Sequence, residues 1–168
     1  MGMKRALLLV TAAAAVYVIV AWASAARLPA DNVAMHVNLA GKVDKSTSRA
    51  GAITYFVAIG AGLLLLAVVA LCACRFVPTR LLSIPHKDYW TTPERAPTVR
   101  QMMVWDVAVI FSMPFLALSF VPVGTALMSK DPAGTSALWI VVPIGVWLLA
   151  MLCYLIWMVR RRYRPAPR

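Results

Sequence analysis

The chain has 168 residues, of which 62% are apolar and only 14% are charged, and its formal net charge is +11. About a quarter of the residues of a typical soluble domain are charged, so this composition argues against a soluble protein. The basic residues cluster beside the apolar segments rather than along one surface, which argues against a nucleic-acid-binding role.

Four apolar segments account for most of the chain. A helix needs roughly 20 residues to cross the ~30 Å hydrocarbon core of a bilayer. Segments of that length lie at about 6–26, 51–74, 102–123 and 137–159. We therefore expect an all-α polytopic membrane protein in which the whole chain, 1–168, forms a single four-helix membrane domain.

The basic residues predict the orientation of these helices. Twelve of the seventeen Lys and Arg residues lie before the first segment, between the second and third, or after the fourth. The positive-inside rule places these regions in the cytoplasm. Both termini and the loop 75–101 are then cytoplasmic, whereas the loop 27–50 is outside. The basic flanks should also contact anionic headgroups of the lipid bilayer.

The first segment also resembles a secretory signal peptide. Lys4 and Arg5 precede it, and the small residues 23–25 are similar to a cleavage site. The apolar run continues to Trp22, which is longer than most signal sequences, so we expect an uncleaved first helix. Cleavage would leave the orientation of the other three helices unchanged.

The outer loop has the pattern of an ordered segment. Apolar residues alternate with other residues from Val33 to Leu39, which is typical of an extended strand on an apolar surface. Ser46, Thr47 and Ser48 can cap the second helix. The loop residues that we expect to contact a partner or to order the loop are His36, Asn38, Gly41 and Asp44.

The second helix and the inner loop carry further signals. Gly60 and Gly62 near mid-membrane either permit a close helix contact or are simply tolerated. The inner loop combines charged residues with aromatic ones that suit the membrane–water interface. Its candidate contact residues are Pro85, His86, Tyr89 and Trp90.

Asp106 is the only ionisable residue within the predicted spans, and such residues are candidates for function. It lies about one turn from the predicted start at 102, where the positive end of the helix dipole would favour an acid. The alternatives are proton transfer, or an ion pair with Arg100 or with a partner subunit. Pro114 should kink this helix.

No pattern indicates a catalytic residue, a cofactor or a metal site. His36 and its neighbouring acids lack the second His or Cys that a zinc site needs. His86 has no nucleophile in a recognisable setting nearby. The three cysteines lie within the spans and are expected to act as small buried apolar residues.

Two stretches resemble a known family. Leu28-Pro29, His36-x-Asn38 and Gly41-x-x-Asp44 resemble the bacterial domain of unknown function at the N-terminus of SdpI-type membrane proteins. The stretch 84–95, which contains Pro85, His86, Tyr89 and Trp90, resembles a cytoplasmic segment of the same proteins. The resemblance covers about residues 6–100. Ala34 stands where the family usually has Pro, Val37 stands where it has Phe, and no Trp follows Asp44.

The resemblance implies a bacterial plasma-membrane protein with a structured outer loop, active in signalling, toxin immunity or the envelope. Together with the residues, it leads us to expect a non-catalytic protein that acts by protein binding, as an accessory subunit or as a small signalling or immunity factor. Its partners would be other membrane subunits or further copies of itself. The alternatives are a small transporter or channel subunit that uses Asp106, and an envelope enzyme that uses the charged cluster around His86.

Overall fold

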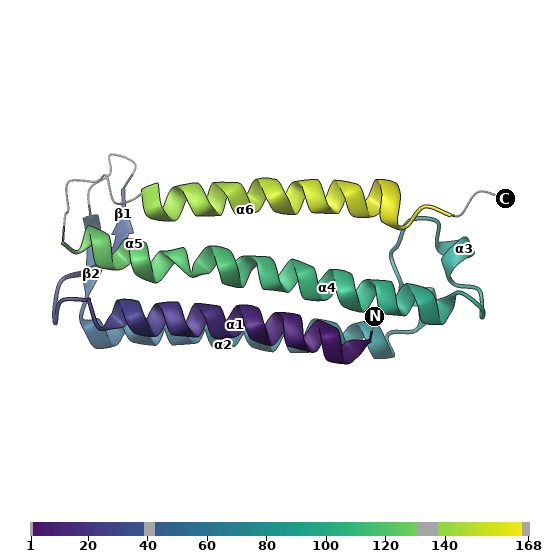
Figure 1. The fold of residues 1–168 in the computed structure, drawn as a ribbon, viewed down its shortest axis with the longest axis horizontal. Helices are drawn as coiled ribbons and strands as arrows, with labels where there is room; N and C mark the ends of the chain where they lie inside the picture. Colours follow the sequence, from purple (N-terminus) through teal and green to yellow (C-terminus); the bar gives the residue numbers. More distant parts are fainter. Residues whose placement is uncertain (1, 39–42, 131–137, 166–168) are drawn as a thin grey trace.

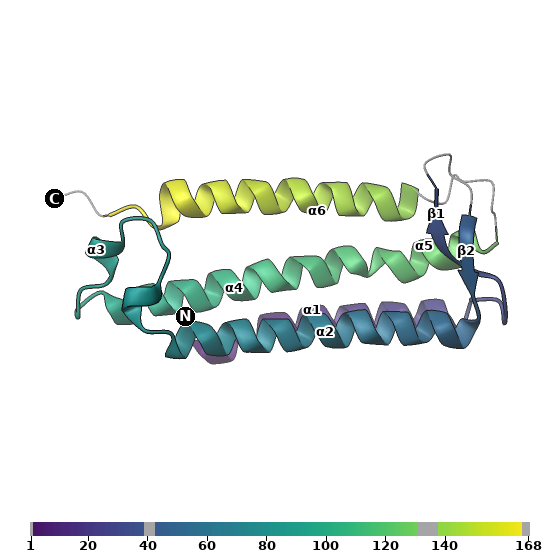
Figure 2. The same ribbon diagram turned by 180° about the vertical axis from the view of Figure 1, so that it is seen from behind.

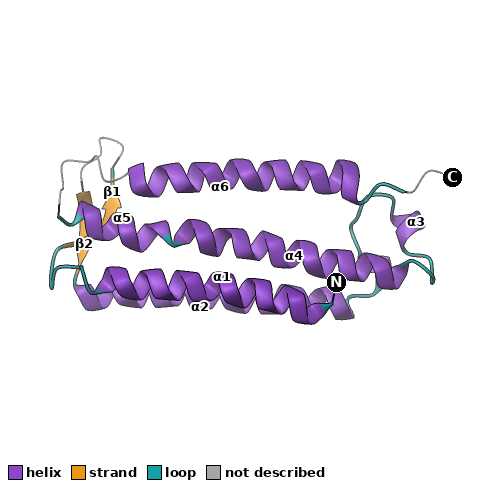
Figure 3. Ribbon diagram, viewed as in Figure 1, coloured by secondary structure: helices purple, strands orange, loops and turns teal. Residues whose placement is uncertain are grey.

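The computed structural model describes residues 2–38, 43–130 and 138–165. Within these ranges, four long helical stretches run lengthwise along the molecule (Figures 1 and 3). They are α1 (Met3–Ala25), α2 (Arg49–Phe76), α4 (Ala96–Leu118) with its continuation α5 (Phe120–Met128), and α6 (Leu138–Trp157) with a π-helical turn (Met158–Arg162). Each stretch is long and apolar enough to cross a membrane, as the sequence predicted.

The two ends of the bundle differ in structure. One end carries the strands β1 (Val33–Val37) and β2 (Val43–Thr47), and we call it the hairpin end. The other end holds the N-terminus of α1, a 3₁₀ turn (Thr79–Leu81), the short helix α3 (Lys87–Trp90) and the π-helical turn (Figure 2). We call it the basic end, because the arginines of the last turn of α6 lie there.

The third span is longer than predicted at both ends. It begins at Ala96 rather than near residue 102, because Pro97 occupies the first turn, where its missing N–H breaks no helical hydrogen bond. The helix continues through Pro114 and is interrupted at Ser119. Pro122 explains this position, because it cannot donate the hydrogen bond that the carbonyl of Leu118 would accept in a continuous α-helix.

The core lies where α4 crosses α1 and α2. Tyr17, Leu71 and Phe115, one from each of these helices, are nearly inaccessible to solvent. The rest of this core consists mostly of small side chains, which let the helices approach closely. Its other buried members are Ala6, Val10, Ala13, Ala67, Cys74, Val104 and Ala108. Of the three cysteines, only Cys74 is buried, so the expectation that all three are buried was wrong for Cys72 and Cys153.

The loop between α1 and α2 forms a β-hairpin. The strand expected after Val33 is present as β1, and it pairs antiparallel with β2, which the sequence analysis did not predict. The fold is therefore mostly helical with one small sheet, rather than purely α. The backbone N–H of Ala34 donates to the hydroxyl of Ser129 at 3.0 Å, which attaches the hairpin to the end of α5. As predicted, Ser48 caps α2, with its hydroxyl accepting from the backbone N–H of Gly51.

Gly60 and Gly62 provide a matched test of close packing. A Cβ atom on Gly60 would lie 2.6 Å from the Tyr17 ring, whereas one on Gly62 would meet no atom within 4 Å. We expect Gly60→Ala to lower the free energy of unfolding by about 1–3 kcal/mol, because the ring must move. Gly62→Ala should be neutral or stabilise by up to about 1 kcal/mol through helix propensity. Unfolding in mixed micelles, followed by tryptophan fluorescence, measures both; equal effects would contradict the close contact.

Candidate functional site

Asp106 lies at the centre of a buried polar cluster. Its side chain on α4 is almost fully enclosed, with a relative exposure of 2% for the residue. The carboxylate accepts hydrogen bonds from the Tyr154 hydroxyl at Oδ1 and from the Tyr163 hydroxyl at Oδ2, both at 2.8 Å. The Nε of Arg162 lies 2.6 Å from Oδ1 and forms an ion pair. We call Asp106, Tyr154, Arg162 and Tyr163 the Asp106 cluster.

The π-helical turn at the end of α6 brings these side chains to one place. A π-turn contains about one residue more than an α-turn. Arg162, eight residues after Tyr154, therefore falls near position i+7 and on the same side of the helix as Tyr154. The backbone N–H of Tyr163 donates to the carbonyl of Met158 at 3.1 Å and closes the turn.

The loop between α2 and α4 packs against the C-terminal end of the Asp106 cluster. The indole Nε1 of Trp90 donates to the carbonyl of Tyr163 at 2.9 Å, and the two rings meet edge to face. The Tyr89 ring packs against Trp90 on one side, and the guanidinium of Arg95 lies 4.1 Å from its centroid. Of the predicted loop residues, Trp90 thus contacts the C-terminal segment directly, and Tyr89 packs against Trp90.

Pro85 and His86 lie in the turn directly before α3. His86 adopts a left-handed backbone conformation with φ of 53° and precedes α3. Neither residue belongs to the Asp106 cluster in the described structure. Of the four predicted contact residues in this loop, Tyr89 and Trp90 therefore pack within the chain, whereas Pro85 and His86 form a turn.

The structure corrects two interpretations of Asp106. It is the eleventh residue of α4, roughly three turns from the start, so the helix dipole at the first turn does not account for it. Arg100 is not its partner either. The Arg100 guanidinium donates instead to three carbonyls at the end of α2, those of Cys74, Arg75 and Val77, and caps that helix.

The negative charge of Asp106 is compensated within the cluster. A buried carboxylate is costly in an apolar surrounding unless a cation and hydrogen-bond donors compensate it, and Asp106 has all three groups. Burial and the hydrogen bond to Asp106 raise the pKa of Tyr163, so its hydroxyl stays protonated and remains a donor. The two phenols and the guanidinium therefore join α4 to the C-terminal end of α6 through Asp106.

The hairpin brings two other predicted residues together. The Nδ1 of His36 lies 2.5 Å from the Oδ1 of Asp44, and both side chains are exposed. The hydrogen bond with His36 holds the pKa of the Asp44 carboxyl below its ordinary value of 3.8. Asn38 is exposed just after β1, and Gly41 lies outside the described residues. Within the described ranges, no three His, Cys, Asp or Glu side chains come together as metal ligands.

Sequence reasoning missed three of the four residues in the Asp106 cluster. Arg162 was counted only as a basic flank, and Tyr154 and Tyr163 were not singled out. A useful signal was present, because an acid inside a span requires a cation and the fourth span ends in three consecutive arginines. The π-turn that selects Arg162 among them has no sequence motif.

Comparisons of the chain with protein-family models, with curated proteins and with solved structures found no match. The resemblance of the two loop stretches to the SdpI-associated family stays a prediction.

The Asp106 cluster can be tested with neighbouring arginines as controls. Arg162→Gln should lower the free energy of unfolding by about 3–5 kcal/mol, because it leaves the Asp106 carboxylate buried without a cation. Arg161→Gln, at an exposed position in the same turn, should change it by less than about 0.5 kcal/mol. The double variant Asp106→Asn with Arg162→Gln should recover part of the loss, as measured by a double-mutant cycle in micelles. Strict additivity would show that the two side chains do not interact.

The hairpin pair predicts a response to acid. Because the folded-state pKa of Asp44 is lowered, its contribution to hairpin stability is complete above the ordinary value of 3.8 and is lost as the pH falls through the lowered pKa. Amide hydrogen exchange of the β1 and β2 backbone should show this loss below pH 3.8. Asp44→Asn should abolish the pH dependence of this protection. Identical acid profiles for the wild type and Asp44→Asn would rule out the pair.

Proposed function

We propose that this chain is a non-catalytic, multi-pass plasma-membrane protein that acts by binding another membrane protein, either as an accessory subunit or as a small signalling or immunity factor. The observation that carries the proposal is the exposure of α6. This helix is apolar along its length, yet it contains no buried residue. A helix so weakly enclosed by its own chain is suited to pack against a second protein.

The described part of α6 has a close contact near each of its ends. At the hairpin end it packs tightly on α5, since a Cβ atom on Gly124 would lie 2.3 Å from the Ile140 side chain. At the basic end, the Asp106 cluster fastens its last turns to α4. Figures 1 and 2 show the α6 ribbon separated from the α4 ribbon along its length.

Between these two attachments lies an apolar groove of about 400 Å³. Its α4–α5 side consists of Met113, Leu116, Ala117 and Phe120, and its α6 side of Val142, Pro143, Val146 and Trp147. The indole N–H of Trp147 is buried and has no hydrogen-bond partner among the described residues. The chain itself encloses this nitrogen, so the apolar side chains of the groove are the surface that a partner helix would meet.

The other two functions receive less support from the geometry. A transporter that uses Asp106 would need a carboxylate that changes its partners, whereas this one is held by two phenols and a guanidinium. An enzyme that uses the His86 cluster would need converging polar groups, yet the aromatic neighbours Tyr89 and Trp90 pack within the chain.

The proposal includes a second contact surface and an orientation. The exposed His36–Asp44 pair on the hairpin offers a polar surface for the same partner. The excess of basic residues at the opposite end supports a cytoplasmic location for both termini. The loop resemblance supports a bacterial plasma membrane.

Two valines on α6 allow a matched crosslinking test. Val146 lines the groove and Val141 does not, although both residues are 62% exposed. A photoreactive amino acid at Val146 should give a discrete protein adduct in native membranes, and the same group at Val141 should not. Co-expression of two differently tagged copies separates self-association from binding to another subunit. Lipid adducts alone at both positions would contradict protein binding through this groove.

A further inference from the structure

A second apolar groove lies on the other side of the bundle, between α1 and α2. Its volume is about 280 Å³, nearly twice that of a ~150 Å³ cavity that binds benzene. Tyr17, Phe56 and Phe115 form its buried floor, with relative exposures of 3%, 3% and 1%. Trp22 and Val57 on its rim are exposed, so the groove opens sideways, away from the core.

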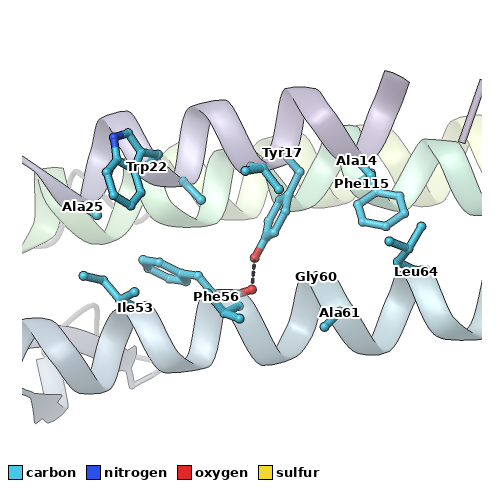
Figure 4. Close-up of a pocket in the computed structure, with 13 residues that line it drawn as sticks. Ala14, Tyr17, Trp22, Ala25, Ile53, Phe56, Gly60, Ala61, Leu64 and Phe115 are labelled. Atoms are coloured by element: carbon cyan, nitrogen blue, oxygen red, sulfur yellow. Dashed lines mark hydrogen bonds between the residues drawn. The ribbon is translucent and has the colours of Figure 1, made fainter. Parts of the chain in front are cut away.

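The groove presents a hydrocarbon surface. The hydroxyl of Tyr17 crosses from α1 and donates to the carbonyl of Phe56 on α2 at 2.7 Å (Figure 4). This bond satisfies the only hydroxyl among the lining residues. Gly60 leaves room for the ring beside that bond. Unlike the groove beside α6, this one leaves no buried donor without a partner among the described residues.

The length of the groove and its position along the two helices match one leaflet of a bilayer. Its lining residues run from Ala14 to Ala25 on α1 and from Ile53 to Leu64 on α2. Eleven residue steps on each helix correspond to roughly 16 Å, close to half of a ~30 Å hydrocarbon core. Ala14 is the middle residue of α1, so the groove extends from mid-span to the hairpin end.

Polar groups suited to a lipid headgroup lie where the groove reaches the hairpin end. The Trp22 indole is 80% exposed near the end of α1, and an indole N–H at the interface can donate to an ester or a phosphate. Arg27 is exposed two residues beyond the last lining residue of α1. Arg49, also exposed, lies at the start of α2 and donates to the Leu28 carbonyl. These two cations favour an anionic headgroup.

We propose that the groove between α1 and α2 binds one acyl chain of an anionic phospholipid from the leaflet at the hairpin end. The hydrocarbon lining holds the chain, and Trp22 and Arg27 contact the headgroup. An apolar groove open to lipid would otherwise lose the dispersion contacts of its walls. The inference is independent of the proposed protein-binding function, which uses α6 on another face.

Photoreactive lipid tests the acyl-chain site. The purified full chain is placed in vesicles of phosphatidylcholine and phosphatidylglycerol that contain phosphatidylglycerol with a diazirine on its acyl chain. Adducts located by mass spectrometry should concentrate on the lining residues of α1 and α2. Ala61→Phe, which fills the groove, should reduce this labelling several-fold, whereas Ala58→Phe, at an exposed position outside the groove, should not. Adducts spread evenly around both helices, or equal labelling of the two variants, would overturn the site.

Arg27→Gln tests the choice of headgroup. It should lower labelling by photoreactive phosphatidylglycerol about fivefold, the factor expected for one basic residue near an anionic surface. Labelling by the matching phosphatidylcholine probe should stay unchanged. Equal loss with both probes, or no loss with either, would contradict recognition of the anionic headgroup.

Discussion

The ion pair between Asp106 and Arg162 determines how the fourth helix joins the bundle. A carboxylate among apolar helices is costly without a cation and donors, and residues of the C-terminal part of α6 and just after it supply them here. That requirement accounts for the π-helical turn, which brings Arg162 onto the same face as Tyr154. It is also consistent with the loop between α2 and α4, where the Trp90 indole donates to the carbonyl of Tyr163, whose phenol reaches the carboxylate.

Because α6 is held mainly near its two ends, its middle part packs only loosely on the other helices. The other three helices bury Tyr17, Leu71 and Phe115 against one another, whereas α6 buries none of its residues in the chain itself. Inside a bilayer, burying apolar surface against lipid or against protein costs nearly the same, so helix association depends on close packing and polar bonds. The tight contact at Gly124 and the polar cluster supply these at the two ends, and the groove remains between them.

The two grooves differ in their surroundings. The groove beside α6 is lined on one side by a helix that buries none of its residues in the chain, which suits packing against a second protein. The groove between α1 and α2 has its one hydroxyl already bonded to Phe56, and the exposed cations Arg27 and Arg49 lie near its hairpin end. These surroundings, rather than size, are the reason for assigning a protein partner to the first groove and a lipid chain to the second.

The four membrane-length helices followed from the sequence alone, because the length of an apolar run directly reflects bilayer thickness. The cap at Ser48 and the strand that begins at Val33 were predictable for a similar reason, since each depends on a few consecutive residues. The importance of Asp106 was also visible as the lone acid in a span. Its partners were not, because Tyr154, Arg162 and Tyr163 lie about fifty residues away and reach it only through a π-turn and the packing of α6 on α4. The pairing of β1 with β2 likewise depended on contacts between segments, since local patterns specify which segments are apolar but not which faces meet.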